Sequence, residues 1–153
     1  MITNFKIFNE NILVPRNIEG RKEKLKQMNI KMLSQEVING DLRLDGSFMD
    51  IDTKFIKLKK VNGSVILEGG QWTEIPEWLK DVEIGGAFSC SSNKLTTLKN
   101  CPQAIGGSFW CSFNKLMSLE GCPKFIGGTF YCFNSKIKLE LPKNVKLKGE
   151  FYN

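Results

Sequence analysis

The chain contains 153 residues, of which 41% are apolar and 25% charged, a composition typical of one soluble domain with a hydrophobic core. It contains no histidine, which excludes Ser-His-Asp and Cys-His nucleophile systems, histidine metal ligands and imidazole pH switches. The net charge of +6 arises from residues 84–153, which carry nine lysines against three glutamates, so an electrostatic partner should favour this half.

Residues 1–37 form an N-terminal segment that contains one predicted helix. Leu25, Met28 and Met32 follow the spacing i, i+3, i+7, which predicts a helix over about residues 20–33 with one apolar stripe. The residues that follow predict a repeat solenoid, whose apolar core is exposed at its ends, so we expect this helix to be the N-terminal cap. The alternative is a basic amphipathic helix that binds a membrane or nucleic acid, which the narrow stripe disfavours.

Residues 38–153 contain a repeat of 21–23 residues that is anchored on glycine. An apolar residue stands two positions before and two positions after each anchor. This period-2 alternation predicts one short strand per unit, with the glycine on its buried side. We expect the units to stack into a parallel solenoid of about five units plus a terminal strand, because a single unit of this length cannot bury its own apolar face. The anchors are Gly40, Gly63, Gly86, Gly107, Gly128 and Gly149.

The segment after the strand carries a more specific pattern. Residues 88–98 read Phe-Ser-Cys-Ser-Ser-Asn-Lys-Leu-Thr-Thr-Leu, and residues 109–119 repeat this order of apolar, Asn and Leu positions. The pattern resembles the leucine-rich repeat. The resemblance implies strands that line a concave face and asparagines, Asn93 and Asn114, whose side chains bond to backbone groups in successive turns. A buried amide without such partners costs about 1–3 kcal/mol.

The resemblance is strong over residues 84–137, weaker over 38–83 and absent before that. The third unit departs from the pattern, because Ser135 stands where asparagine is expected. In its glycine, cysteine and Asn-Lys-Leu positions the repeat is similar to short cysteine-containing repeats of uncharacterised tailed-bacteriophage proteins. The resemblance therefore implies a phage origin.

The five cysteines follow the same spacing of 21 residues, so they belong to the repeat. Their odd number and the absence of a CxxC motif argue against a disulfide framework and a zinc site. We expect them to be small apolar side chains in the interior; three aligned thiols that bind a soft metal are the alternative. They are Cys90, Cys101, Cys111, Cys122 and Cys132.

A second candidate for metal binding is the acidic cluster of Asp45, Asp50 and Asp52. It lacks the glycine and the closing glutamate of a calcium loop, so we interpret it as a solvated turn. The sequence therefore predicts no cofactor and no bound metal.

Residues three positions after the anchor glycines should point outward from the strands. In the last repeats these are Trp110, Tyr131 and Tyr152, which would form an aromatic ladder with neighbours about 5 Å apart. Phe133 should share this face and Phe113 should lie at its rim. Contiguous exposed aromatic residues are typical of protein interfaces, which makes this face the predicted partner-binding site. The alternative is that the aromatic rings only stabilise the sheet or are covered by the N-terminal residues.

Lys94, Lys115 and Lys136 form a second predicted row, eight residues after the anchors. Exposed like charges are tolerated on a solvated edge, which is the simpler interpretation. The alternative is a row of anion contacts for nucleic acid, which the scarcity of arginine disfavours.

The final strand, Gly149–Asn153, should present an apolar edge with Phe151 pointing inward. An edge strand of this kind invites pairing with another chain, so we expect a homo-oligomer or a docked partner there.

These features together predict a non-enzymatic module that binds a host or phage protein through its aromatic face. One alternative is a structural virion protein that assembles through its termini; another is nucleic-acid binding by the lysine-rich half. No apolar run approaches the roughly 20 residues that span a bilayer, and the first residues lack a signal-peptide core. We therefore expect the host cytoplasm or the virion as its location, without signal-peptide secretion and without a membrane partner.

Overall fold

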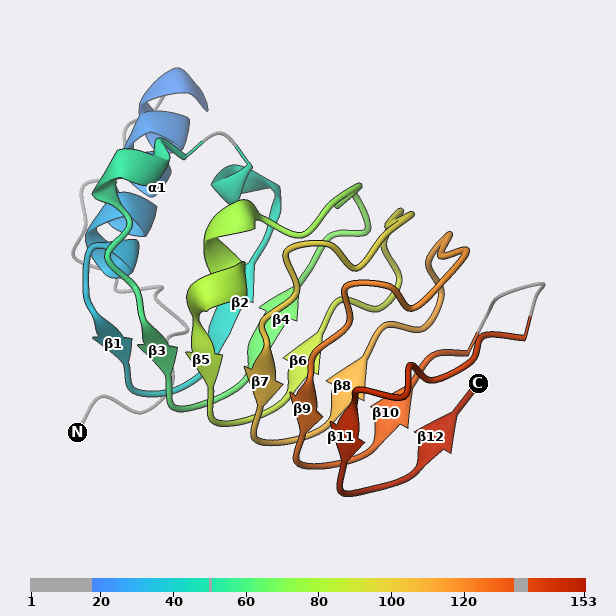
Figure 1. The fold of residues 1–153 in the computed structure, drawn as a ribbon. Coiled ribbons are helices and arrows are strands. Elements are labelled where there is room, and N and C mark those ends of the chain that lie inside the picture. The colour runs from blue at the N-terminus through green and yellow to red at the C-terminus, as the bar shows by residue number, and fades with distance from the viewer. Residues whose placement is uncertain (1–17, 50, 134–137) are drawn as a thin grey trace.

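The computed structural model describes residues 18–49, 51–133 and 138–153. Helix α1 (Ile18–Leu33) lies at one end, and the chain then winds into a solenoid of parallel strands (Figure 1). The N-terminal helix and the repeat solenoid that the sequence predicts are thus confirmed. Ser135 and Lys136 lie outside the described residues.

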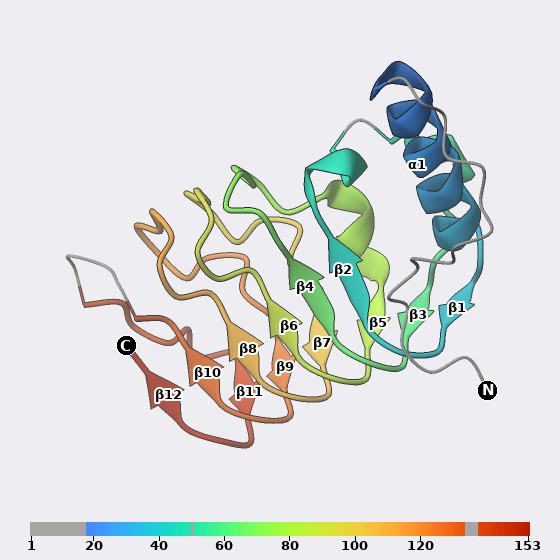
Figure 2. The ribbon, with the colours of Figure 1, turned by 180° about the vertical axis from the view of Figure 1, so that it is seen from behind.

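Each coil of the solenoid contributes one strand to each of two six-stranded parallel sheets. The first sheet contains, in order, β1 (Val37–Ile38), β3 (Lys60–Val61), β5 (Glu83–Ile84), β7 (Ala104–Ile105), β9 (Phe125–Ile126) and β11 (Lys146–Leu147). The second sheet, which Figure 2 shows from its own side, contains β2 (Leu42–Leu44), β4 (Val65–Leu67), β6 (Phe88–Ser89), β8 (Phe109–Trp110), β10 (Phe130–Tyr131) and β12 (Phe151–Tyr152).

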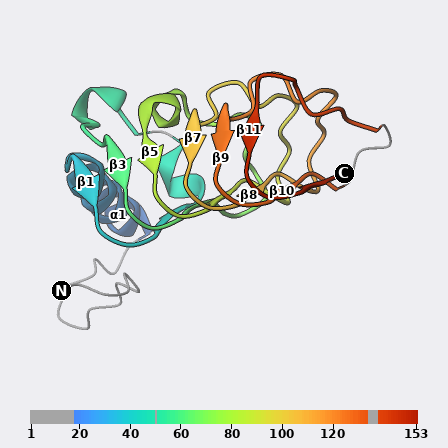
Figure 3. The same ribbon diagram turned by 60° about the horizontal axis from the view of Figure 1, so that its bottom comes forward.

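The prediction of one strand per unit is wrong, because the chain bends at each anchor glycine and the strand is divided in two. Figure 3 looks onto these bends, which connect the first sheet to the second. Successive bends hydrogen-bond directly to each other: the amide of Gly86 donates to the carbonyl of Gly63 at 2.9 Å, and the amide of Gly107 donates to that of Gly86 at 2.8 Å. The apolar residues two positions before and after each anchor keep the spacing of one continuous strand, so the sequence pattern did not reveal the break. The expectation that the anchor glycine lies on the buried side is also wrong: between buried Ile84 and buried Phe88, Gly86 and its two neighbours are exposed or half-buried.

Glycine is required at positions 106 and 127 of the bends, because the neighbouring backbones approach too closely there for a side chain. A Cβ atom on Gly106 would lie 2.2 Å from the carbonyl oxygen of Gly85, and one on Gly127 would lie 2.1 Å from that of Gly106. These distances fall far inside van der Waals contact. The bends therefore set the spacing between coils.

The core lies between the two sheets and is built from rows of identical or similar side chains. The second sheet contributes a row of phenylalanines, and Phe88, Phe109 and Phe130 are fully buried. Neighbouring rings in this row lie 4.8–5.7 Å apart. The first sheet contributes buried aliphatic residues that face this row, namely Ile38, Val61, Ile84, Ile105 and Ile126.

The return segments of the first coils contain 3-10 turns: η1 (Gly46–Phe48), η2 (Thr53–Phe55) and η3 (Glu77–Asp81). Trp72 and Ile75, which precede η3, are buried.

Two buried asparagines connect successive turns, as the predicted ladder requires. The Asn114 side-chain amide donates to the carbonyls of Cys90 and Cys111, both at 2.9 Å, and its Oδ1 accepts from the amide of Leu95 at 3.0 Å. Asn93 makes the equivalent bonds one coil earlier, including one from the amide of Trp72 at 3.2 Å. Each asparagine thus ties its own turn to the preceding coil.

Helix α1 packs against the first coil through only part of the predicted stripe. Met32 packs against the core and Met28 is half-buried, whereas Leu25 is 42% exposed. Asn29 and Leu33, which lie outside the predicted stripe, are buried. The Asn29 side-chain amide donates to Ser47 Oγ at 2.8 Å, a polar contact with η1 that the spacing of apolar residues does not predict.

We predict that Gly127→Ala strongly destabilises the fold, because its Cβ would clash with backbone that no side-chain rotation can move. The free energy of unfolding should fall by about 3 kcal/mol in urea denaturation. Gly46→Ala is the matched control, since a Cβ there has no neighbour within 4 Å. Equal midpoints for both variants would show that the bends are not under this constraint.

We also predict that Asn114→Ala lowers the free energy of unfolding by about 1–3 kcal/mol, because it leaves a buried backbone amide and buried carbonyls without their partner. Asn62→Ala is the control: its amide bonds to Asn39 on the surface, where loss should cost less than about 0.5 kcal/mol. Denaturant midpoints at unchanged m-value measure both.

Candidate binding surface

The second sheet carries a ladder of aromatic side chains on its outer face. Ser89 of β6, Trp110 of β8, Tyr131 of β10 and Tyr152 of β12 are paired in register, so the constant coil length places them in one row. The ring centroids of Trp110 and Tyr131 lie 6.2 Å apart, and those of Tyr131 and Tyr152 lie 5.4 Å apart. The predicted ladder therefore exists.

Phe133 widens this row, as expected, and packs 6.1 Å from Tyr131 and 6.2 Å from Tyr152. We refer to Trp110, Tyr131, Phe133 and Tyr152 as the aromatic face. Three of its members are exposed by 40–43%, and Tyr131 is half-buried between its neighbours. Among the residues that the structure describes, nothing covers this face.

The rings of Tyr131 and Tyr152 are nearly parallel, with planes inclined by only 11°. The ring of Trp110 is tilted by 34° against that of Tyr131. The Tyr152 hydroxyl donates to the Glu150 carboxylate, which raises the pKa of the Tyr152 phenol and keeps it a hydrogen-bond donor.

Phe113 lies on the turn beyond the aromatic face and combines two unfavourable features. It is 64% exposed, and its backbone has φ 57°. A left-handed conformation costs a residue with a side chain roughly 1 kcal/mol, and a bulky one rarely adopts it. Its amide donates to the carbonyl of Phe133 at 2.9 Å, which connects this turn to the aromatic face.

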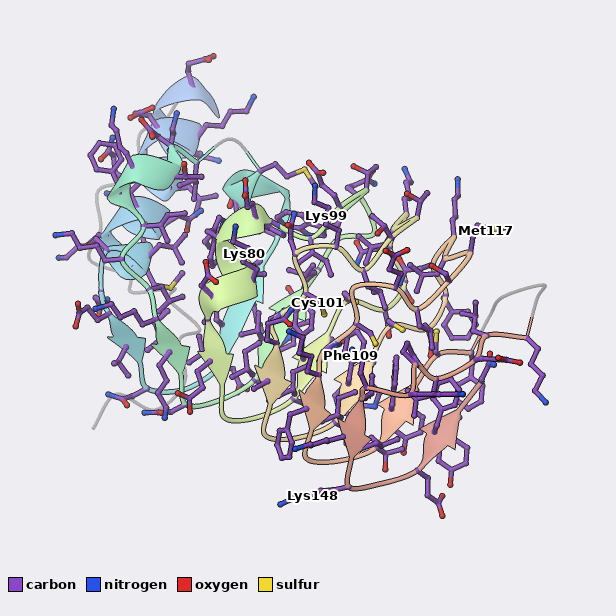
Figure 4. The ribbon with its side chains drawn as sticks, viewed as in Figure 1. Lys80, Lys99, Cys101, Phe109, Met117 and Lys148 are labelled. Carbon is purple, nitrogen blue, oxygen red and sulfur yellow. The ribbon has the colours of Figure 1, made fainter. Side chains whose placement is uncertain are left out.

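Met117, which the sequence analysis did not select, is 71% exposed on the same turn. Figure 4 shows it on the row of turns, on the opposite side of the solenoid from Lys148 and the bends. Aligning the repeats on glycine places Met117 opposite Thr96 of the preceding coil. This difference between a polar and an apolar residue at equivalent repeat positions could have identified Met117 from the sequence.

The lysine row is confirmed only in part. Lys94 and Lys115 occupy equivalent exposed turn positions, while Lys136 lies outside the described residues. The Lys94 ammonium donates to Gln71 Oε1 at 3.1 Å. In the described part of the chain neither lysine makes an ion pair.

All five cysteines are free and buried, which confirms their predicted place in the interior. Burial among apolar side chains raises the pKa of the Cys90, Cys101 and Cys111 thiols well above the ordinary range, and that of Cys122 to about 11. Thiols held in this protonated state are weak nucleophiles and weak metal ligands. The pKa of the Cys132 thiol is instead lowered, because it takes part in a hydrogen bond with the Cys111 thiol.

Two of the three aspartates of the acidic cluster are turn caps. Asp45 Oδ1 accepts from the amide of Ser47 at 2.9 Å, and Asp52 Oδ1 accepts from that of Lys54 at 3.1 Å. Asp50 lies outside the described residues. In the described ranges no three acidic, cysteine or histidine side chains gather as a metal site would require.

A cavity of about 320 Å³ opens near the N-terminal end, and no residue of the aromatic face or of the lysine row lines it. Phe48, Ile51, Trp72 and Trp78 line it together with the carboxylate-bearing Glu74 and Glu77. Its walls come from return segments of different coils, so sequence spacing gave no indication of it.

At the C-terminal end, β12 pairs only with β10, and β11 only with β9, among the described residues. Phe151 packs 5.1 Å from Phe130 and remains half-buried. The edge that the sequence predicts at Gly149–Asn153 is thus present, with no described strand on its outer side.

Scans against protein-family models, curated proteins and solved structures found no match to the chain. None of the helices in the described ranges has the length and apolar character needed to cross a membrane.

We predict that the native protein resists thiol reagents such as 5,5′-dithiobis(2-nitrobenzoate) at neutral pH and that five thiols react after denaturation. Since burial raises the native pKa of four of the five thiols, those of Cys90, Cys101, Cys111 and Cys122, the unfolded chain loses these thiol protons first as pH rises. The free energy of unfolding should therefore decline above about pH 8.5, the ordinary thiol pKa. Rapid labelling of the folded protein, or stability that is flat to pH 10, would contradict the buried arrangement.

Proposed function

We propose that the chain is a leucine-rich-repeat-like module that binds another protein through the aromatic face and performs no catalysis. The observation that carries this proposal is a contiguous aromatic surface on a regular sheet, with Trp110, Phe133 and Tyr152 exposed by 40–43%. Tryptophan and tyrosine dominate the energetics of protein interfaces, and a surface of this kind on a soluble protein usually has a partner.

The orientation of the rings favours a protein over a nucleic acid. Bases bind aromatic side chains by stacking on an open ring face. Tyr131 is flanked on both sides, by Trp110 and by Tyr152, and is half-buried between them, which limits access to its ring faces. The only arginine in the repeats, Arg43, is paired with Glu68. Aromatic rings together with the Tyr152 hydroxyl suit the mixed apolar and polar surface of a protein.

The resemblance of residues 84–137 to bacteriophage repeats indicates where to search for the partner. We propose a host or phage protein, in the host cytoplasm or in the virion. Among the described residues no strand pairs with the outer sides of β11 and β12, which favours a second candidate function, assembly with further subunits in a virion. Enrichment of the chain in purified phage particles tests that alternative.

We predict that the triple variant Trp110→Ser, Tyr131→Ser, Tyr152→Ser keeps the fold and loses the partner. Serine occupies the same register at Ser89, so the sheet accepts it. The measurement is affinity capture from nuclease-treated bacterial lysates, with and without phage infection, followed by mass spectrometry. A specific protein should be lost from the triple variant, with its affinity for the purified partner reduced by at least about tenfold.

The matched control carries the same change on the other sheet, Val37→Ser with Phe125→Ser, and should retain the partner. Capture of the same proteins by wild type and triple variant would contradict the proposal. Tight, strongly salt-dependent binding of a labelled single-stranded oligonucleotide, lost in the triple variant, would replace it with nucleic-acid binding.

A further inference from the structure

Two consecutive coils place different side chains on the same backbone turn. Ser92 and Phe113 have φ 56° and 57°. Their amides make equivalent hydrogen bonds to the next coil, Ser92 to Ser112 and Phe113 to Phe133, both at 2.9 Å. The first turn carries Ser92 and Thr96 at the two positions where the second carries Phe113 and Met117. Comparing the two turns therefore shows which side chains the shared backbone conformation needs.

The fold does not need the two apolar side chains. Serine and threonine serve the same positions one coil earlier, and Phe113 and Met117 are 64% and 71% exposed where they stand. A phenylalanine in the left-handed region adds strain that serine, asparagine or glycine would lessen or remove. Strain and exposure together at one residue are typical of recognition sites.

We infer that the turn from Ser112 to Ser118 is a projecting recognition element whose Phe113 and Met117 side chains enter an apolar pocket edged by carboxylates on a partner protein. This inference rests on the proposed protein-binding function and names the chemistry of the partner. A phenylalanine and a methionine that project from a turn require a concave apolar surface, and the unbranched thioether of Met117 adapts to its shape.

The positive charge around the turn is the reason for proposing carboxylates at the rim of the partner's pocket. Lys94 and Lys115 are exposed at equivalent positions of this row of turns, and neither forms an ion pair with any described residue. Just beyond the turns, the exposed residues Lys99 and Glu120 occupy equivalent positions and contribute no net charge. Figure 4 shows Lys99 and Met117 on the same side of the molecule. Carboxylates on the partner would complement these ammonium groups and speed association.

A protein is favoured over a lipid surface because the turn continues into the aromatic face through the hydrogen bond from Phe113 to Phe133. The aromatic face runs along the solenoid through β8, β10 and β12, whereas the turn projects beyond it. A partner protein can contact both, and membrane binding becomes an outcome of the test.

The decisive variant is Phe113→Ser with Met117→Thr, which gives the second turn the residues of the first. Its melting temperature should stay within about 2 °C of wild type or rise, because these side chains are exposed. Phe113→Asn should raise the melting temperature by about 2–4 °C, since asparagine accepts the left-handed region. A clear fall in either variant would show that the side chains serve the fold and would overturn the inference.

The partner is identified by placing benzoylphenylalanine at Phe113 or at Met117 in the full chain and irradiating living host cells. The expected result is one protein cross-linked from both positions, through an apolar pocket that has Asp or Glu at its rim. Its purified form should bind Phe113→Ser/Met117→Thr at least about tenfold more weakly than wild type. Wild-type binding should also weaken as sodium chloride rises from about 0.05 to 0.5 M.

Equal affinity of wild type and the double variant for the cross-linked protein would overturn the inference. So would cross-links to a basic or pocketless surface, or sedimentation with phosphatidylglycerol vesicles that the double variant alone abolishes. Binding lost in the Trp110/Tyr131/Tyr152 serine variant but kept in the double variant would overturn this inference and leave the proposed function standing. If the wild-type chain binds no protein at all, both this inference and the proposed function are overturned.

Discussion

The close stacking of the glycine bends is the constraint on which the rest of the structure depends. A Cβ on Gly106 or Gly127 would meet the preceding bend at 2.1–2.2 Å, so these backbones lie as near as they can. Hydrogen bonds between successive bends then fix one register for the whole stack. Because the register never changes over the last coils, equivalent residues fall into straight rows, both inside the solenoid and on its surface.

The interior rows are filled with little variation, and the outer rows are where the coils differ. Phe88, Phe109 and Phe130 repeat one residue type inside, and the asparagines of successive turns repeat one hydrogen-bond pattern. Outside, Ser89 gives way to Trp110 and Tyr131 in the same register. Regular packing of the interior thus allows the outward-facing residues to differ between coils, and the aromatic face consists of such residues.

Much of this arrangement follows from sequence spacing, and the exceptions have physical reasons. The 21-residue period predicted the solenoid, the buried cysteines and the ladder of Trp110, Tyr131 and Tyr152. The break of each strand at glycine could not be predicted, because the apolar residues on either side of each glycine keep the period-2 spacing of one continuous strand. The orientation of α1 depends on a polar contact of Asn29, and the left-handed backbone of Phe113 depends on a turn whose residue types differ between coils.

The uniform register also bears on how such a chain can change its length. Each coil touches only its neighbours, so an in-frame duplication of 21 residues within the last coils would insert a complete coil without disturbing those on either side. The stack would grow by about 4.8 Å. Duplicating the coil of Trp110 would add another aromatic rung and another projecting turn, whereas duplicating the coil of Ser89 would separate existing features. Unequal recombination could therefore enlarge or dilute the surface one coil at a time.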